Sequence, residues 1–346
     1  MVSALTNSHH TSNVVVLLLV LGGLWLGWRV KRNEPWHDAL ADAFRRGPTA
    51  WCVLGLYVLV ALADSVAWKG GVSAAAPDQV ARFEAKSLLD RAVGGKTEKS
   101  YSAPLATREF ARDRPLVRPG THLLGTDKLG RDVLFVTLKG ARVALLVGGF
   151  TSLIAIPLAL LFGVLAGYFG KWIDDGVFFV MSTLASMPSV LLLVAMITAL
   201  PRGTIWVCVA LGVTSWVGFC RLARGETFKL RELDYVNAAR ALGASHARII
   251  VRHILPNLLH LVLIRFVLLF SALVLSEAVL SWLNIGVDGS WGQMVAQAKN
   301  ELSRDPIVWW NVAGATVGLV GLLLSINVVG DTIRDALDPR TRGDRA

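Results

Sequence analysis

The chain has little charge and few cysteines for its length. Only 17% of its 346 residues are Asp, Glu, Lys or Arg, whereas 54% are hydrophobic and the mean hydropathy is +0.54. Soluble domains carry about 25% charged residues, so this composition excludes an ordinary soluble globular protein. The cysteines, Cys52, Cys208 and Cys220, lie in or beside apolar runs and lack the spacing of zinc ligands. They predict small packing residues, and neither a metal site nor a disulfide framework.

The sequence also lacks a complete nucleotide-binding loop and a catalytic constellation. Residues Gly94–Thr97 are similar to the end of a phosphate-binding loop, but Asp90 occupies the position of its first glycine. A catalytic pair of Asp127 and Asp132 is an alternative, but no nucleophile, metal ligand or base accompanies them in the sequence. We therefore expect this chain to supply no catalytic residue and to bind no metal or cofactor of its own.

What the sequence has instead is a series of long hydrophobic runs. A helix needs about 20 apolar residues to cross a bilayer, so these runs predict an all-α polytopic membrane protein with about seven transmembrane helices. A signal peptide is the alternative for the first run, but no Lys or Arg precedes it and the basic Arg29–Arg32 follows it, which favours a retained span. The predicted spans are Val14–Val30, Ala50–Trp68, Val143–Tyr168, Val177–Leu200, Thr204–Cys220, Leu259–Leu283 and Val312–Val329.

Positive charge is gathered in a few segments, and its distribution predicts the orientation. Basic residues cluster after the first run, in residues 221–258 and at the end of the chain. Threading the spans through a bilayer puts these clusters on one side, which the positive-inside rule makes the cytoplasm, so the net charge of +10 does not indicate a nucleic-acid partner. Residues 69–120 then lie outside as a long segment of mixed charge. This organisation predicts two N-terminal spans in residues 1–68 and a core in residues 121–346.

Within the core, residues 221–258 are the most informative segment. Tyr235–Leu242 is rich in Ala and Leu and predicts a helix, which Gly243 would end as a left-handed cap. Ser245 is placed to cap a second helix, which we expect to stop at Pro256. Small residues on a short helix allow a partner's groove to approach closely, so we interpret the segment as a docking element. A solvated basic linker between two spans is the alternative.

These residues resemble the EAA loop of binding-protein-dependent ABC importers. The match rests on Ala238-Ala239, on Gly243 and on Leu255-Pro256, and its details resemble the dipeptide, oligopeptide and nickel branch. Asn237 departs from the motif, which usually has Glu there, so no salt bridge to an ATPase is expected at that position. We refer to residues 221–258 as the EAA-type loop. The resemblance implies that the ATPase-coupling residues are Tyr235, Asn237, Ala238, Ala239, Gly243, Ala244, Leu255 and Pro256.

Three other stretches extend the resemblance over about residues 121–340. His122–Val133 resembles the segment before the second core span of the C-type permease subunit, and Asp127 or Asp132 there predicts the cap of a short interfacial helix. Ser276–Val287 and Asn327–Arg340 resemble the end of the fifth span and the C-terminal signature. The periplasmic motif within the first of these stretches is Gly125, Thr126, Asp127, Gly130, Arg131 and Asp132.

Glu277 and Arg265 are the ionisable residues of the run Leu259–Leu283. A charge inside the bilayer costs roughly 2.5–3.5 kcal/mol on insertion scales, so such residues are candidates for function. Arg265 is near enough to the cytoplasmic end for its guanidinium to extend to the surface. Glu277 lies near the outer end, where it has either a role at an external gate of the pathway or a structural pairing.

The resemblance implies a type I ABC importer transmembrane domain of six spans plus one added N-terminal span. It implies a multi-pass permease subunit of the bacterial inner membrane that imports di- or oligopeptides, or alternatively nickel or another peptide-like solute. The implied partners are a second homologous permease, two ATPase subunits that bind the ATP, and a periplasmic or lipid-anchored substrate-binding protein. An ion-coupled secondary transporter is the rival from another class, but it would need ionisable residues or broken helices near the midplane, and the spans are nearly free of charge.

Overall fold

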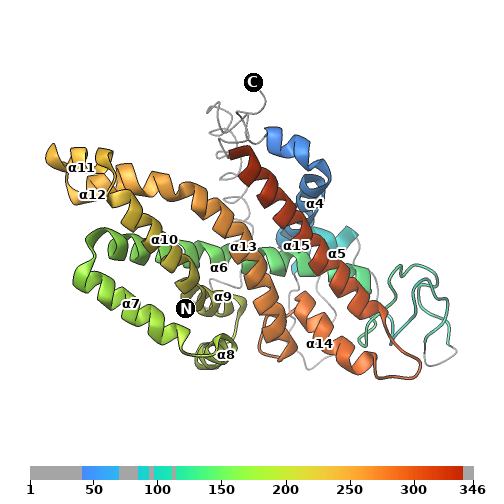
Figure 1. Cartoon of the computed structure of the whole chain (residues 1–346). Coiled ribbons are helices and arrows are strands. Elements are labelled where there is room, and N and C mark those ends of the chain that lie inside the picture. The colour runs from blue at the N-terminus through green and yellow to red at the C-terminus, as the bar shows by residue number, and fades with distance from the viewer. Residues whose placement is uncertain (1–40, 70–84, 93–96, 111–113, 338–346) are drawn as a thin grey trace. The chain divides into compact units, whose positions relative to one another are not determined.

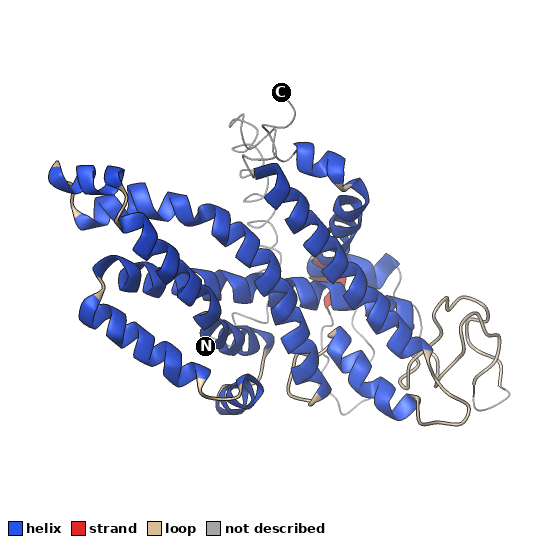
Figure 2. Ribbon diagram, viewed as in Figure 1, coloured by secondary structure: helices blue, strands red, loops and turns tan. Residues whose placement is uncertain are grey.

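Helices dominate both compact units of the chain (Figures 1 and 2). The computed structural model describes residues 41–69, 85–92, 97–110 and 114–337. Among the described residues, the first unit is formed by those up to Leu145 together with Gly289–Ala336, and the second by Leu146–Asp288. The predicted span Val14–Val30 lies outside the described residues.

The first unit is packed around the indole of Trp291. Trp291 Nε1 donates to the Thr137 carbonyl at 2.8 Å, and the Tyr57 ring meets the indole edge-on with centroids 6.0 Å apart. Gly140 and Gly318 leave room for the indole, because a Cβ atom on Gly140 would lie 2.4 Å from it and one on Gly318 2.7 Å. The elements of this unit are α4 (Pro48–Ser65), β1 (Ala67–Lys69) and its antiparallel partner β2 (Ala85–Ser87), α5 (Leu88–Ala92), the start of α6 (Val133–Phe169), α14 (Trp291–Glu301) and α15 (Trp310–Leu337).

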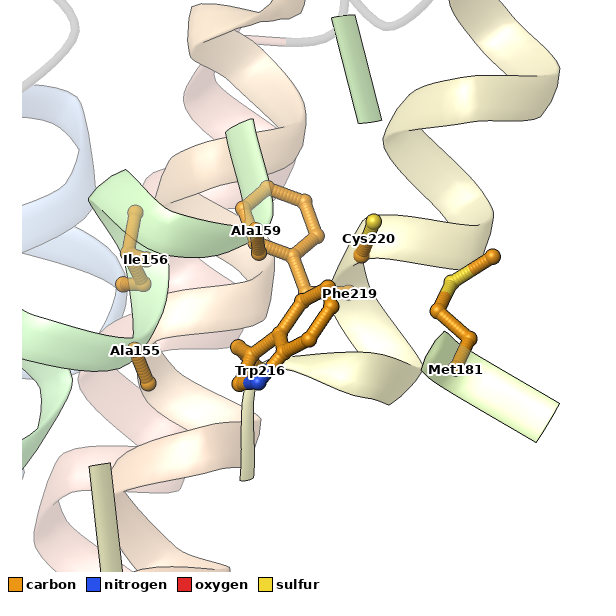
Figure 3. Close-up of a cluster of buried hydrophobic side chains, with 7 residues drawn as sticks. All are labelled: Ala155, Ile156, Ala159, Met181, Trp216, Phe219 and Cys220. Atoms are coloured by element: carbon orange, nitrogen blue, oxygen red, sulfur yellow. The ribbon is translucent and has the colours of Figure 1, made fainter. Parts of the chain in front are cut away.

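The second unit is held by small residues of α6 that face large side chains of its neighbours (Figure 3). Ala155 and Ala159 are fully buried in a cluster with Trp216, Phe219 and Met181. Alanine leaves room for the two rings, so the cluster reaches the close packing of a protein core. The elements of this unit are the rest of α6, α7 (Lys171–Ala185), α8 (Ser189–Ala199), α9 (Thr204–Ser215), α10 (Val217–Arg231), α11 (Asp234–Ala241), α12 (His246–Ile249), the π-helix η1 (Ile250–Ile254) and α13 (Leu255–Trp282).

Four helices of the described chain are long and apolar enough to cross a membrane, and two bent helix pairs raise the number to as many as six. The bent pairs are α7 with α8 and α9 with α10, with axes 92° and 40° apart. This number agrees with the six predicted spans that fall within the described residues, Ala50–Trp68 and the five of the core. The four single spans are Pro48–Ser65, Val133–Phe169, His246–Trp282 and Trp310–Ala336.

The prediction of one continuous span over Val177–Leu200 is wrong. α7 ends at Ala185 and α8 begins at Ser189, on either side of Pro188. Proline has no N–H to donate to the preceding turn, and it disfavours the helical conformation in the residue before it. Since the longer runs on both sides of Pro188 are apolar, hydropathy alone does not reveal the break.

Gly163 and Gly149 of α6 provide a matched test of close packing. A Cβ atom on Gly163 would lie 2.8 Å from the carbonyl oxygen of Cys220, whereas one on Gly149 would meet nothing within 4 Å. Alanine favours helix over glycine by about 1 kcal/mol, so Gly149→Ala is expected to keep or raise stability. Gly163→Ala is expected to lower it by about 1–3 kcal/mol. Thermal melts of the purified variants measure the difference, and equal melting temperatures would contradict the packing.

Candidate functional site

The EAA-type loop is a helix, a tight turn and a second helix, as the sequence predicts. α11 carries Asp234 in its first turn and Arg240 in its last, so both charges complement the helix dipole. The corner between α10 and α11 is held by Asn237, whose Nδ2 donates to the Glu232 carbonyl at 3.1 Å. The carboxylate of a glutamate at position 237 would have no N–H to donate to this carbonyl. The amide therefore fixes this corner at the position where the sequence departs from the EAA motif.

Gly243 ends α11 in the predicted left-handed conformation, with a φ of 78°. The Gly243 N–H donates to the Arg240 carbonyl and the Ala244 N–H donates to the Ala239 carbonyl, both at 3.0 Å. Together these bonds form a Schellman motif, which satisfies carbonyls that the helix end would leave open. Ser245 then caps α12, since its hydroxyl accepts a backbone N–H from the first turn at 3.4 Å.

The inner face of α11 is anchored in an apolar cluster. Val236 is fully buried there, and Ala239 and Ala244 pack against the edge of the cluster. A helix held in this way moves together with the chain it packs on, because the interior is close-packed. The other buried members are Val164 and Tyr168 of α6, and Ile249, Ile254 and Leu258 of the returning chain.

The outer face of α11 is exposed and apolar at its tip. Leu242 is 89% exposed and Tyr235 is 42% exposed, and Ala238 between them is also exposed. These three positions are three and four residues apart, so they share one face of the helix. The sequence analysis missed Leu242. A large apolar residue directly before a capping glycine was the available signal, because a helix end that projects from the core leaves such a side chain uncovered.

Pro256 does not end the second helix, and that prediction is wrong. α12 continues through η1 into α13, and His246–Trp282 is one span. The Leu255 N–H donates to the Ile250 carbonyl, five residues back, which is the bond of a π-helix. In a regular α-helix the proline ring would clash with the carbonyl of the preceding turn, and the wider π-turn relieves this clash.

Asn257, near the end of the EAA-type loop, bonds back to Tyr235 at the start of α11. Its Nδ2 donates to Tyr235 Oη at 3.1 Å and to the His253 carbonyl at 2.6 Å. The structure therefore gathers the predicted coupling residues at one end of the second unit (Figure 1). It also divides them, because some face solvent and others pack inward. Tyr235, Asn237, Ala238, Gly243 and Pro256 are exposed, while Ala239, Ala244 and Leu255 are half-buried.

The periplasmic motif is a tight loop in which two glycines bring backbones together. Gly125 and Gly130 have φ values of 67° and 72°. A Cβ atom on Gly125 would lie 2.3 Å from the Ser102 carbonyl oxygen, and one on Gly130 would lie 1.9 Å from that of Glu98. Both glycines are thus required by conformation and by space. We refer to the described residues 97–110 and 114–132 as the cap.

The two carboxylates of the motif turn inward. Asp127 Oδ1 accepts the N–H groups of Leu129 and Arg131, both at 2.9 Å, and Oδ2 pairs with the Arg131 side chain. Asp132 Oδ1 accepts the Phe135 N–H at 3.2 Å, at the start of α6. Asp132 therefore caps a helix, but that helix is the long α6, so the prediction of a short interfacial helix is wrong. Asp127 closes a turn instead.

Thr126 joins the motif to the rest of the first unit. Its hydroxyl donates to the Ser100 carbonyl at 2.8 Å and accepts the Ser102 N–H at 2.7 Å. Its own carbonyl accepts Trp310 Nε1–H at 2.9 Å. The motif residues thus hold the cap on α6 and α15.

Glu277 is buried near the C-terminal end of α13 and bonds to the chain that follows. Ser281 Oγ donates to Glu277 Oε1 at 2.5 Å, and the Val287 N–H donates to the same oxygen at 3.2 Å. A Cβ atom on Gly286 would lie 2.0 Å from Ser281 Oγ, so glycine allows this close turn. Of the two alternatives for Glu277, this geometry supports the structural pairing, and a role at a gate stays a prediction.

The EAA-type loop and the cap present shaped surfaces to a partner and not metal-binding groups. In the part of the chain that the structure describes, no group of three or more His, Cys, Asp or Glu side chains could hold a metal ion. The loop presents an exposed apolar tip on a firmly packed base, and the cap presents backbone turns that glycines and carboxylates fix in place.

Residues 159–343, more than half of the chain, match the family described as "Binding-protein-dependent transport system inner membrane component". The chain belongs to this permease family. Membership confirms the predicted all-α fold of an ABC importer permease, and it decides against the ion-coupled secondary transporter. The bend at Pro188 shows that a broken helix alone does not separate the two classes.

The permease is similar to curated transport proteins named for peptides. It is 31% identical over 224 residues to the oligopeptide transport system permease protein OppC of Bacillus subtilis (64% of this chain, 72% of that protein). It is 32% identical over 238 residues to the dipeptide transport system permease protein DppC of the same organism (68% and 74%). A putative peptide transport system permease protein of Brucella suis is 38% identical over 244 residues (69% and 80%).

Gly243 provides a test of the turn in this permease. A Cβ atom there would meet nothing within 4 Å, so the effect of a substitution comes from the left-handed φ alone. Gly243→Ala is expected to cost about 1–2 kcal/mol, and Gly243→Asn less, because asparagine visits this conformation routinely. Hydrogen exchange of residues 234–258 in the purified protein measures the loss of protection. Equal protection in wild type and Gly243→Ala would show that the turn does not depend on glycine.

Glu98 gives the cap a dependence on pH. Burial would raise the pKa of Glu98, but the N–H groups of Val117 and Arg118, each 2.9 Å away, and His122 outweigh it, so the pKa lies below its ordinary value. Because the folded-state pKa is the lower one, ionised Glu98 stabilises the cap above the unfolded value of about 4.3. This stabilisation is lost as the pH falls through the folded-state value.

We therefore expect the exchange protection of residues 114–120, corrected for intrinsic rates, to fall as the pH drops below about 4. Glu98→Gln is expected to remove this dependence and to lower protection at neutral pH. Glu109→Gln, in the same cap, is the control and should keep the wild-type profile. A pH profile of Glu98→Gln identical to that of wild type would contradict the role of Glu98.

Proposed function

We propose that this permease forms half of the translocation pathway of an ATP-driven importer for di- and oligopeptides in the bacterial inner membrane. A second, homologous permease supplies the other half. Two separate ATPase subunits bind the ATP, and a periplasmic or lipid-anchored binding protein delivers the peptide. The exposed tip of α11 is the observation that carries the proposal, in a chain whose relatives are named as oligopeptide and dipeptide permeases.

The tip of α11 has the form of a docking surface. Leu242 projects beside the small side chains of Ala238 and Ala241, which are exposed as well. Covering an exposed leucine side chain is worth about 1.5–3 kcal/mol, and the flat surface next to it lets a partner approach closely. Tyr235 adds an aromatic ring with a polar end at the edge of this surface.

The base of α11 makes it suitable for transmitting movement. Val236 is fixed in the cluster with Val164 and Tyr168 of α6, and with Leu258 of α13. A force on the tip therefore displaces the spans and does not merely bend the loop. Because a ligand shifts a conformational equilibrium only by its differential affinity for the two states, the ATPases drive transport by binding the loop differently with and without ATP.

The same proposal assigns a side to each segment. The EAA-type loop carries a cluster of Arg and Lys, so it lies in the cytoplasm, where the ATP is. The cap lies outside, on the side from which the binding protein delivers peptide. Long segments are translocated largely regardless of their charge, so the basic residues of the cap do not oppose this topology.

Leu242→Asp tests the dock directly. We expect it to reduce the ATPase that co-purifies with the tagged permease by about 30-fold, because a charge replaces an apolar side chain at the centre of the contact. Leu105→Asp is the matched control, since Leu105 is also an exposed leucine (57%) but belongs to the cap. Equal recovery of ATPase with Leu242→Asp and with wild type would contradict docking at α11.

The substrate class is tested by uptake of labelled dipeptides and tripeptides into cells of the source organism. Deletion of the permease gene is expected to abolish the ATP-dependent part of that uptake, and the wild-type gene should restore it. Leu105→Asp should restore it as well, and Leu242→Asp should not. Unchanged peptide uptake in the deletion strain would show that the substrate is of another class.

A further inference from the structure

An ion pair joins the EAA-type loop to a helix outside it. Arg224 of α10 pairs with Asp174 of α7, fifty residues earlier in the chain. Two nitrogens of the guanidinium donate to the two oxygens of the carboxylate. Nη2 lies 2.7 Å from Oδ2, and Nε bonds to Oδ1. A two-pronged arginine–carboxylate contact fixes orientation as well as distance. The guanidinium also lies over the rings of Phe228 and Phe178, 4.9 Å and 5.8 Å from their centroids.

Beside this ion pair, two glycines of α6 allow α10 to pack closely against α6. A Cβ atom on Gly163 would lie 2.8 Å from the Cys220 carbonyl oxygen, and one on Gly167 would lie 2.7 Å from that of Arg224. Small residues four apart allow two helices to touch through their backbones, as in membrane helix pairs. α6 and α10 therefore behave as one stiff body.

The end of α6 is closed by residues of the same loop. Arg231 Nη1 donates to the Gly167 carbonyl at 3.0 Å, which supplies a donor where the helix runs out of N–H groups. The hydroxyl of Tyr168 and Nδ1 of His246 share a hydrogen bond of 2.8 Å. The loop thus holds α6 through residues of two of its helices, α10 and α12.

α7 is attached to this body in a different way. It begins directly after α6 at a sharp corner, where Gly170 and Lys171 both have positive φ, 63° and 52°. Met181 is the one buried residue of α7, and most of the others are exposed. We interpret this corner of two residues as a hinge. The angle between α6 and α7 then depends on the contacts that α7 makes close to the corner. Asp174 lies one turn beyond that corner.

The far end of α7 borders a cavity. Leu184, Ala185 and Met187, at the bend between α7 and α8, line a cavity of about 570 Å³ together with residues of α8, α9, α10 and α13. α7 has 15 residues. At about 1.5 Å per residue, a rotation of roughly 10° at the corner displaces Ala185 by about 4 Å. Such a displacement is enough to open or close one wall of the cavity.

We propose that the pair of Arg224 and Asp174 is the link that makes α7 follow α6 and α10 when the EAA-type loop is displaced, so that this wall of the cavity moves with the loop. Without the pair, α7 would turn at its corner and the wall would lag behind. Met181 packs by apolar contact, which allows sliding, whereas the two-pronged ion pair resists both sliding and rotation. Arg224 and Asp174 are thus positioning residues that act on the pathway through α7. The inference rests on the proposed function, because it gives a route to the movement that the ATPases impose on α11.

The test uses the whole transporter, purified from the source organism through a tag on this permease. Asp174→Asn keeps the shape of the side chain but removes its charge, and Arg224→Lys keeps a charge but loses the planar fork. For each variant, the co-purified ATPase and its basal ATP hydrolysis are measured on the purified complex. The uptake of labelled dipeptide is measured in cells that carry the same variant. Lys229→Ala is the control, because it removes an ion pair with Glu226 that stays within α10.

We expect both variants to keep the co-purified ATPase and its basal hydrolysis near the wild-type level. Uptake should fall by about fivefold or more, which is the fold-change that a typical coupling between two sites produces. More ATP would then be hydrolysed per peptide imported. The exchanged pair, Asp174→Arg with Arg224→Asp, should recover part of the uptake. Lys229→Ala should match wild type in all three measurements.

Two results would overturn the inference. Wild-type uptake in Asp174→Asn and Arg224→Lys would show that the pair transmits nothing. Loss of the ATPase from the complex in parallel with uptake, without recovery in the exchanged pair, would show that the pair only holds the fold. Failure of the proposed function gives a different result from failure of this inference. If no ATPase co-purifies with the wild-type permease, the proposed function is overturned before any variant is compared.

Discussion

Backbone contact between α6 and α10 is the constraint on which the second unit depends. Helices usually pack with their axes about 8–10 Å apart because side chains separate them. Gly163 and Gly167 of α6 contribute no side chain, and carbonyl oxygens of α10, with the side chains of Ala223 and Thr227, occupy the space that a Cβ atom would need. α10 leads directly into α11, so the place of the docking helix depends on two glycines of a neighbouring span as well as on the cluster around Val236. The stability of the second unit and the proposed coupling between the ATPases and the spans therefore depend on the same contact.

The cap satisfies a different constraint with a different set of residues. It consists mostly of turns, so its backbone groups lack the regular partners of a helix or a sheet. Buried polar groups need hydrogen-bond partners, and here the carboxylates of Glu98, Asp127 and Asp132 accept backbone N–H groups at the turns. Glycines at 125 and 130 allow the chain to approach closely enough for these bonds to form.

Sequence reasoning succeeded where the cause of a structure is local. Gly243 and Ser245 predict the turn of the EAA-type loop, because a left-handed C-cap and a hydroxyl N-cap depend on neighbouring residues only. The motif around Asp127 was located but misassigned, since the helix it adjoins begins at Val133, well before the apolar run. The break at Pro188 was missed because hydropathy does not register backbone geometry.

Other features were out of reach because they join distant parts of the chain. The pairing of Arg224 with Asp174 depends on how α7 and α10 pack, and the contact of Tyr168 with His246 depends on how α6 and α12 pack. The exposure of Leu242 follows from the position of α11 at the end of its unit, which a single helix pattern does not contain. Asn237 looked like a weakened motif position, and its bond to the Glu232 carbonyl gives it a role that requires the corner to exist first.

The π-helix before Pro256 has a consequence for phase. A π-turn accommodates one residue more than an α-turn, and each residue of an α-helix advances the faces by about 100°. If residues 250–254 were one residue shorter and regular, α12 would be rotated by that angle relative to α13. Ile249 would then leave the cluster that it shares with Val236, while Leu258 would stay. The extra residue keeps two faces in step, one that belongs to the loop and one that belongs to the span.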